Sequence, residues 1–249
     1  MSTLSILVYG VLAAAANVVG GLWVTSREHL NQFALRLLVA LGAGFMLAAV
    51  FLEVLPESLR MWDQASRLPW ILFLGGYLLV QLFEHTLAPH FHFGEETHHE
   101  EMLDSHVSIT AVGALAIHTF FDGISIASGF VIDLKLGIVI FIAIMLHKLP
   151  EGFTVASIML ASGRGPSAAR LATYIIGLAT LLGVATVTFV QTLAPYTLPL
   201  SAGVTLYVAA SDLIPEVNEK EGFRTAVFVF AGVALYYVTD VLLMGVYAH

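Results

Sequence analysis

The chain has 249 residues, of which 58% are hydrophobic and only 11% are charged. Its mean hydropathy of +0.88 lies far above that of a soluble globular domain and indicates an integral membrane protein. The net charge of −8 comes without any run of Lys and Arg, which argues against a nucleic-acid partner, and the absence of cysteine excludes disulfides, thiolate ligands and iron–sulfur clusters.

Eight apolar stretches, each about 20 residues long, are predicted to cross the membrane as helices. They cover residues 3–24, 33–56, 70–88, 107–131, 136–160, 169–193, 198–216 and 225–247. These spans leave no room for a second folded domain. We therefore expect residues 1–249 to form a single all-α integral membrane domain, surrounded by lipid.

Basic residues are distributed unequally between the two sides that these spans define. The loops after spans 1, 3, 5 and 7 would lie on one side with Arg27, Arg36, Arg164, Arg170, Lys220 and Arg224, and the other side has Arg60, Arg67 and Lys135. Cytoplasmic loops of membrane proteins carry the excess of Lys and Arg. The pattern predicts a multi-pass protein of the cell membrane with both termini outside.

Spans 2 and 7 contain an internal repeat. The stretch from Ala43 to Glu57 aligns with the stretch from Ala202 to Glu216, with Ala, Gly, Leu, acid, Pro and Glu in matching positions. Because spans 2 and 7 would cross in opposite directions, this favours an inverted repeat of spans 1–3 and 6–8 around the central spans 4 and 5. The repeat predicts an acidic pair near each membrane face on a possible pathway: Glu53 and Glu57 outside, Asp212 and Glu216 inside. The alternative is that Pro-Glu only marks a helix end at the interface.

A loop dense in histidine and carboxylates is expected over residues 85–106, between spans 3 and 4 on the cytoplasmic side. Its candidate metal-binding residues are His90, His92, His98 and His99. Tracts of this composition bind metal loosely, so the loop could act as a metal sink or sensor. The alternative is a solvated acidic loop whose histidines have no role.

Spans 4 and 5 each carry a histidine four residues ahead of a carboxylate: His118 with Asp122, and His147 with Glu151. Four residues is about one helical turn, so each pair shares one helix face. Ionisable groups inside a membrane are costly and are functional candidates by default. Small residues near both motifs would let the two helices touch. The two imidazoles and two carboxylates would then form a donor set that suits a divalent transition metal such as zinc.

Two further residues of span 5 affect this site. Pro150 lacks an N–H group, so the helix is expected to kink or open near Leu146. Lys148 lies about 100° round the helix from the neighbouring histidine. Lys148 could pair with Glu151 or Asp122, extend toward the interface, or hold the place of a second cation.

On these motifs the chain resembles the ZIP (Zrt/Irt-like) family of metal transporters over all eight spans. The segment from His147 to Gly152 fits the family motif His-x-x-Pro-Glu-Gly, and the segment from His118 to Gly123 matches it in a variant form. The run from Leu206 to Ala209, followed by Ile-Pro-Glu, is typical of the seventh span. The resemblance implies eight helices with both ends outside, a His-rich cytoplasmic loop, and metal-binding motifs in spans 4 and 5.

The resemblance to some family members implies a two-metal centre, with a polar residue just after each motif histidine and an extra glutamate from span 6. The corresponding positions here are Thr119, Lys148 and Thr180. A cationic Lys148 would repel a second divalent ion, so a one-metal site is expected. Ser211 stands where a histidine often precedes the span 7 acid, which weakens the predicted inner relay.

The predicted function is uptake of a divalent metal into the cytoplasm through the site between spans 4 and 5. Zn²⁺ is the predicted substrate, and Fe²⁺, Mn²⁺ and Cd²⁺ are alternatives that these residues do not rank. The alternatives are a membrane-embedded zinc hydrolase and a metal sensor without transport. No His-Glu-x-x-His motif occurs, so a transporter rather than an enzyme is predicted. Sequence does not fix the oligomeric state, and a homodimer is one possibility.

Overall fold

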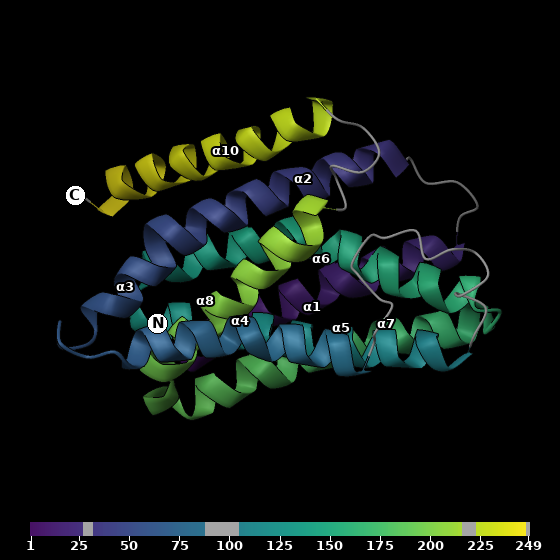
Figure 1. Ribbon diagram of the computed structural model, residues 1–249, viewed down its shortest axis with the longest axis horizontal. Helices are drawn as coiled ribbons and strands as arrows, with labels where there is room; N and C mark the ends of the chain where they lie inside the picture. Colours follow the sequence, from purple (N-terminus) through teal and green to yellow (C-terminus); the bar gives the residue numbers. More distant parts are fainter. Residues whose placement is uncertain (27–31, 88–104, 216–222, 248–249) are drawn as a thin grey trace.

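The structure is a computed structural model that describes residues 1–26, 32–87, 105–215 and 223–247. Within these ranges all regular secondary structure is helical (Figure 1). The α-helices are α1 (Thr3–Ser26), α2 (Gln32–Ala49), α3 (Leu55–Arg60), α4 (Leu68–Leu87), α5 (Ser105–Ile132), α6 (Leu134–Ala161), α7 (Gly165–Phe189), α8 (Ala194–Tyr207) and α10 (Phe223–Tyr247). The other helical segments are the π-helices η1 (Val50–Val54) and η3 (Val208–Leu213) and the 3₁₀-helix η2 (Gln191–Leu193).

The predicted eight-helix membrane architecture is confirmed. Seven helical segments are long and apolar enough to cross a membrane, and α4 adds a shorter apolar stretch, Leu68–Phe83. Large hydrophobic side chains are exposed along the outward faces of α4, α7 and α10, as expected for surfaces that face lipid. The chain is therefore a multi-pass membrane protein.

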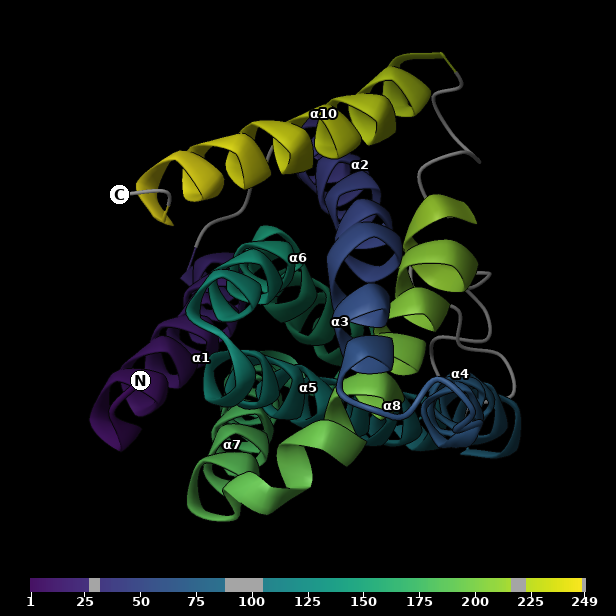
Figure 2. The same cartoon turned by 90° about the vertical axis from the view of Figure 1, so that its left-hand side faces the viewer.

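The helices pack in two groups. Helices α1, α5, α6 and α7 contact one another extensively, whereas α4 pairs with α8 and α10 pairs with α2. The groups meet where α5 contacts α8 and where α2 contacts α6, and the end-on view in Figure 2 shows this arrangement. Spans 4 and 5, which carry the two histidine motifs, correspond to α5 and α6 and belong to the first group.

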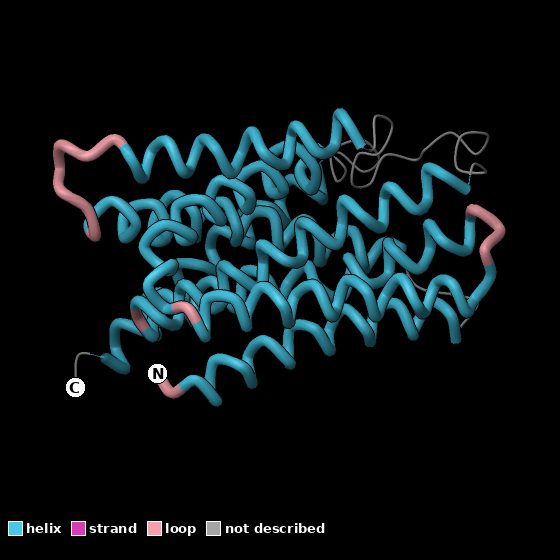
Figure 3. The backbone as a smooth tube through the Cα atoms, turned by 90° about the horizontal axis from the view of Figure 1, so that it is seen from below, coloured by secondary structure: helices cyan, strands magenta, loops and turns pink. Residues whose placement is uncertain are grey.

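The start of α1 and the end of α10 lie at the same end of the bundle (Figures 1 and 3). Asp133 alone connects α5 to α6, and its carboxylate accepts a hydrogen bond of 3.1 Å from the Leu136 N–H as the N-cap of α6. This tight reversal places α5 and α6 side by side along most of their length.

Spans 2 and 7 each contain a π-helical segment at matching positions of the predicted repeat. These segments are η1 and η3, which contain Glu53 and Asp212 and end shortly before Pro56 and Pro215. Proline cannot donate to the carbonyl one turn earlier, so a wider turn is accommodated there. The expected opening near Leu146 does not interrupt α6, which continues as α-helix through Pro150.

Glycines bring the backbones of the first group close together. A Cβ atom on Gly152 of α6 would meet the main chain of Asn17 in α1, and one on Gly123 of α5 would meet the carbonyl of Thr180 in α7. Only glycine fits where helix backbones approach this closely. The first group is therefore tightly packed around the middle of α5 and α6.

Candidate metal site

His118 and His147 lie at the middle of α5 and α6, which have 28 residues each. At 1.5 Å per residue, each histidine is about 20 Å from either end of its helix. Both side chains are buried. The two motifs thus lie midway along two helices that are long and apolar enough to cross a membrane.

The structure brings the four predicted side chains into one group. One ligand atom from each of His118, Asp122, His147 and Glu151 can be chosen so that all lie within 4.8 Å of one another, and all four residues are buried. Asp122 Oδ2 lies 3.2 Å from His118 Nε2 and 3.3 Å from His147 Nε2. Glu151 Oε1 lies 3.7 Å from His118 Nε2. The i, i+4 spacing and the α5–α6 contact together produce this geometry.

A backbone carbonyl fixes the orientation of one imidazole. His147 Nδ1 lies 3.1 Å from the Ala143 carbonyl oxygen, which can only accept a hydrogen bond, so Nδ1 carries the proton. Nε2 of the same ring lies 3.3 Å from Asp122 Oδ2. The imidazole nitrogen and the carboxylate oxygen are thus adjacent, and both are atom types that ligate divalent transition metals. The Ala143 carbonyl, by holding Nδ1, orients the ring so that Nε2 is available to a metal ion.

Lys148 is completely buried and pairs with both carboxylates. Its ammonium donates to Asp122 Oδ2 at 2.6 Å and to Glu151 Oε2 at 2.7 Å. Of the predicted alternatives, pairing is therefore correct and extension toward the interface is wrong. Two carboxylates and one ammonium, with neutral imidazoles, give the group one net negative charge. Both carboxylates are thus paired with the ammonium of a lysine side chain of this protein.

Asn17 of α1 was missed by the sequence reasoning and contacts the same group. It is fully buried, and its amide nitrogen, when oriented toward the two nearby oxygens, donates to the Lys148 carbonyl at 2.5 Å and to Glu151 Oε2 at 3.0 Å. Glu151 Oε2 thus has two donors, whereas buried Oε1 accepts no hydrogen bond within the described part of the chain and faces His118. Asn17 belongs to no motif, and its only sequence signal is a polar amide in an apolar span.

Other residues near the motifs are bonded elsewhere. The hydroxyls of Thr119 and Thr180 donate to the Ala116 and Ile176 carbonyls of their own helices. The Ser211 hydroxyl lies 3.2 Å from that of Tyr77. These hydroxyls add no donor to the group of four.

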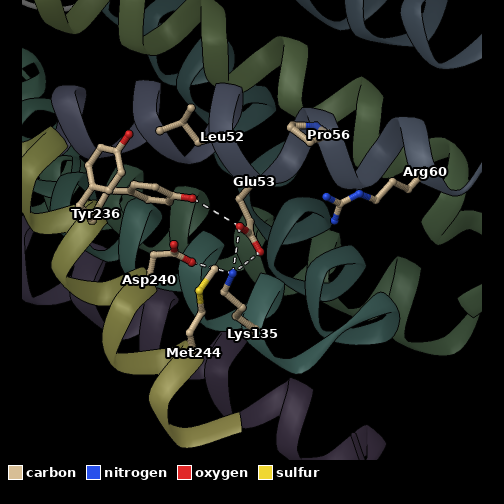
Figure 4. Close-up of a pocket in the computed structure, with 9 residues that line it drawn as sticks. Leu52, Glu53, Pro56, Arg60, Lys135, Tyr236, Asp240 and Met244 are labelled. Atoms are coloured by element: carbon tan, nitrogen blue, oxygen red, sulfur yellow. Dashed lines mark hydrogen bonds and ion pairs between the residues drawn. The ribbon is translucent and has the colours of Figure 1, made fainter. Parts of the chain in front are cut away.

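Three acidic residues of the predicted pathway, Glu53, Glu57 and Asp212, lie in the described part of the chain and outside this group. Glu53 pairs with Lys135 at 3.1 Å near one end of the bundle (Figure 4), and Glu57 pairs with Arg60 at 3.1 Å within α3. Asp212 is buried in η3. Glu216 and the loop residues His90, His92, His98 and His99 fall outside the described residues. A pathway role for these acids stays a prediction.

Comparison with known proteins finds similarity to zinc transporters. The family model described as ZIP Zinc transporter matches residues 1–113 and 94–240. Zinc transporter zipt-7.2 of Caenorhabditis elegans is 30% identical over 147 residues, which are 53% of this chain and 32% of that protein. Zinc transporter ZIP13 of Pongo abelii is 23% identical over 78% of this chain and 62% of that protein. Zinc transporter YKE4 of Saccharomyces cerevisiae is 22% identical over 83% of this chain and 71% of that protein.

The similarity extends along most of this chain, although the matched part spans only about a third of zipt-7.2 and 18% of human ZIP6. Between them, the two matched ranges of the family model include all eight predicted spans in whole or in part and both histidine motifs. With an all-helical membrane fold and a buried His/carboxylate group at its centre, the chain belongs to the ZIP zinc transporter family.

Proposed function

We propose that this protein transports divalent transition metal ions, with zinc as the preferred substrate, into the cytoplasm. The observation that carries the proposal is the buried group of His118, Asp122, His147 and Glu151 at the middle of two membrane-spanning helices. The three relatives described above are named zinc transporters, which supports zinc. They do not favour the hydrolase alternative.

The four side chains supply what a metal ion loses when it leaves water. Two imidazole nitrogens and two carboxylate oxygens replace its hydration shell, and the carboxylates compensate its charge. A metal that binds here competes with the Lys148 ammonium for both acids, which lie 2.6 and 2.7 Å from it. This competition keeps the affinity low enough for release. It also supports the one-metal site, since the ammonium repels a second divalent ion.

Protons provide a second way to weaken binding. Imidazole and carboxylate must be deprotonated to bind a metal, so its affinity decreases as the surroundings become acidic. We propose both termini outside the cell, as the distribution of basic residues indicates. Transport of Fe²⁺, Mn²⁺ or Cd²⁺, contact with specific lipids, and assembly as a homodimer stay predictions.

Reconstitution into sealed liposomes that contain a zinc-sensitive dye tests the proposal. External zinc should produce a dye response with the unaltered protein, and His147→Ala and Glu151→Ala should abolish it. Thr186→Val is the matched control, because this residue is only half-buried on α7 and its hydroxyl donates to the Leu182 carbonyl of the same helix. Influx that persists in both site variants would contradict the proposed site, and hydrolysis without influx would favour an enzyme. Competing Fe²⁺, Mn²⁺ and Cd²⁺ in the same assay rank the substrates.

A further inference from the structure

A second lysine, which is only partly buried, bridges two carboxylates at one end of the bundle (Figure 4). Lys135, near the start of α6, lies 3.1 Å from Glu53 Oε1 and 2.6 Å from Asp240 Oδ1. It also donates to Glu53 Oε2 at 3.2 Å, and Tyr236 OH donates to the same oxygen at 3.4 Å. The side chains of Lys135, Glu53 and Asp240 are 19%, 18% and 16% exposed. These three residues are called the Lys135 cluster below.

The Lys135 cluster joins the two groups of helices. Lys135 belongs to α6, which carries His147 and Glu151 of the candidate metal site. Its partners belong to the other group, Glu53 to η1 and Asp240 to α10. The other lysine and arginine pairs described above do not join the two groups. Lys148 pairs with residues of α5 and α6, which are both in the first group, and Arg60 pairs with Glu57 inside α3. A charge interaction between the groups is thus anchored on the helix that holds half of the metal donors.

Transport requires that the buried site become accessible from each side in turn, and this requires the site-bearing helices to move relative to their neighbours. Lys135 and His147 are separated by about 18 Å along the same helix, which behaves as a rigid rod. A displacement of α6 relative to η1 and α10 by a few ångströms would therefore break contacts of 2.6–3.2 Å. The cluster can stay intact only while α6 holds its present position.

We propose that the Lys135 cluster is an ion-pair latch that favours the conformation described here, in which the metal site is buried. The inference rests on the proposed transport function, since a latch matters only if the helix groups move. Partial exposure suits this role. The cluster borders a cavity of about 260 Å³ that also reaches Arg60 and Tyr237, so water can solvate the charges when they separate. An ion pair without access to water would separate too rarely, because its charges could not be hydrated when they part.

Accessibility of a cysteine reporter tests the latch, because the chain has no native cysteine. Ser201→Cys places a thiol at a buried position in the small cavity between η1, α5, α6 and α8. Its rate of modification by a charged methanethiosulfonate reagent is measured in metal-free protein. Adding Lys135→Met, Glu53→Gln or Asp240→Asn should raise this rate about tenfold, because conformations with separated groups become more populated. Size-exclusion chromatography identifies variants that remain folded, and any one of the three suffices.

Two controls make the result specific. Arg60→Met removes a cation at the same cavity but breaks a pair within one helix, so it should leave the rate unchanged. The charge exchange Lys135→Glu with Glu53→Lys lets the new lysine face both acids and should restore the slow rate. Unchanged rates in all folded cluster variants, or an equal rise in Arg60→Met, would overturn the latch. Because no metal is present, the outcome is independent of liposome uptake, so failure of the latch and failure of the transport proposal can be told apart.

Discussion

Lys148→Met removes the ammonium from the metal site while retaining an unbranched side chain of similar length. In the structure this ammonium is fully buried and contacts both carboxylates at 2.6 and 2.7 Å. Removing one partner of a buried ion pair leaves uncompensated charge and costs about 3–5 kcal/mol. The metal-free variant should therefore be less stable than the unaltered protein by about this amount.

The same change should strengthen zinc binding. At an effective dielectric constant of 20, two unit charges 4 Å apart interact by about 4 kcal/mol, and a divalent ion doubles this figure. If the lysine side chain moves away as the ion enters, most of this repulsion is avoided in the unaltered protein. We therefore expect zinc affinity to rise by about tenfold to a hundredfold, about 1.4–2.8 kcal/mol. Because tighter binding slows zinc release, the maximal rate of zinc uptake should decrease. Half-saturation should occur at a lower zinc concentration.

Thermal unfolding with and without zinc, together with calorimetric zinc titration, measures both effects. A ligand stabilises the folded state by RT ln(1 + [L]/Kd), so zinc should raise the melting temperature of Lys148→Met more than that of the unaltered protein. Lys148→Arg keeps the positive charge and is the control, with no gain in zinc affinity. Weaker zinc binding in Lys148→Met, or unchanged stability without metal, would refute the proposed competition between the ammonium and the metal.

The other predictions concern the surroundings of the site. Asn17→Leu removes a hydrogen bond of 3.0 Å to the Glu151 carboxylate, and such a bond is worth about 1.5–3 kcal/mol. Calorimetric titration should therefore show zinc binding weakened at least tenfold. Unchanged zinc affinity would contradict a role of Asn17 in positioning Glu151. Gly152→Ala should lower stability by about 1–3 kcal/mol in thermal unfolding, because the added methyl meets the Asn17 main chain. Gly113→Ala, where nothing lies within 4 Å, is its control. Zinc affinity should fall as pH decreases from about 7.5 to 5.5, across the usual titration range of imidazole, and a flat titration series would argue against histidine ligands.

The sequence by itself determined the membrane architecture and the two histidine motifs. Length and hydropathy alone set the eight spans, because a helix that crosses hydrocarbon needs about 20 apolar residues whatever its neighbours are. The spacing of His118 and Asp122, and of His147 and Glu151, placed each pair on one helix face for the same local reason. The matching Glu53 and Asp212 positions were likewise visible in sequence, and η1 and η3 now lie there.

Tertiary structure alone decided which partners the remaining charges have. Helices that are apolar on every side carry no periodic signal to show which face turns inward, so neither their rotation nor their relative height follows from the sequence. From the sequence, Lys148 could have paired with Asp122, with Glu151 or with neither. It contacts both because the packing of α5 against α6 places Asp122 level with Lys148 and Glu151. Asn17 reaches Glu151 because glycine lets α1 approach α6. Lys135 meets Asp240, more than a hundred residues away, because α10 packs on α2 beside the start of α6.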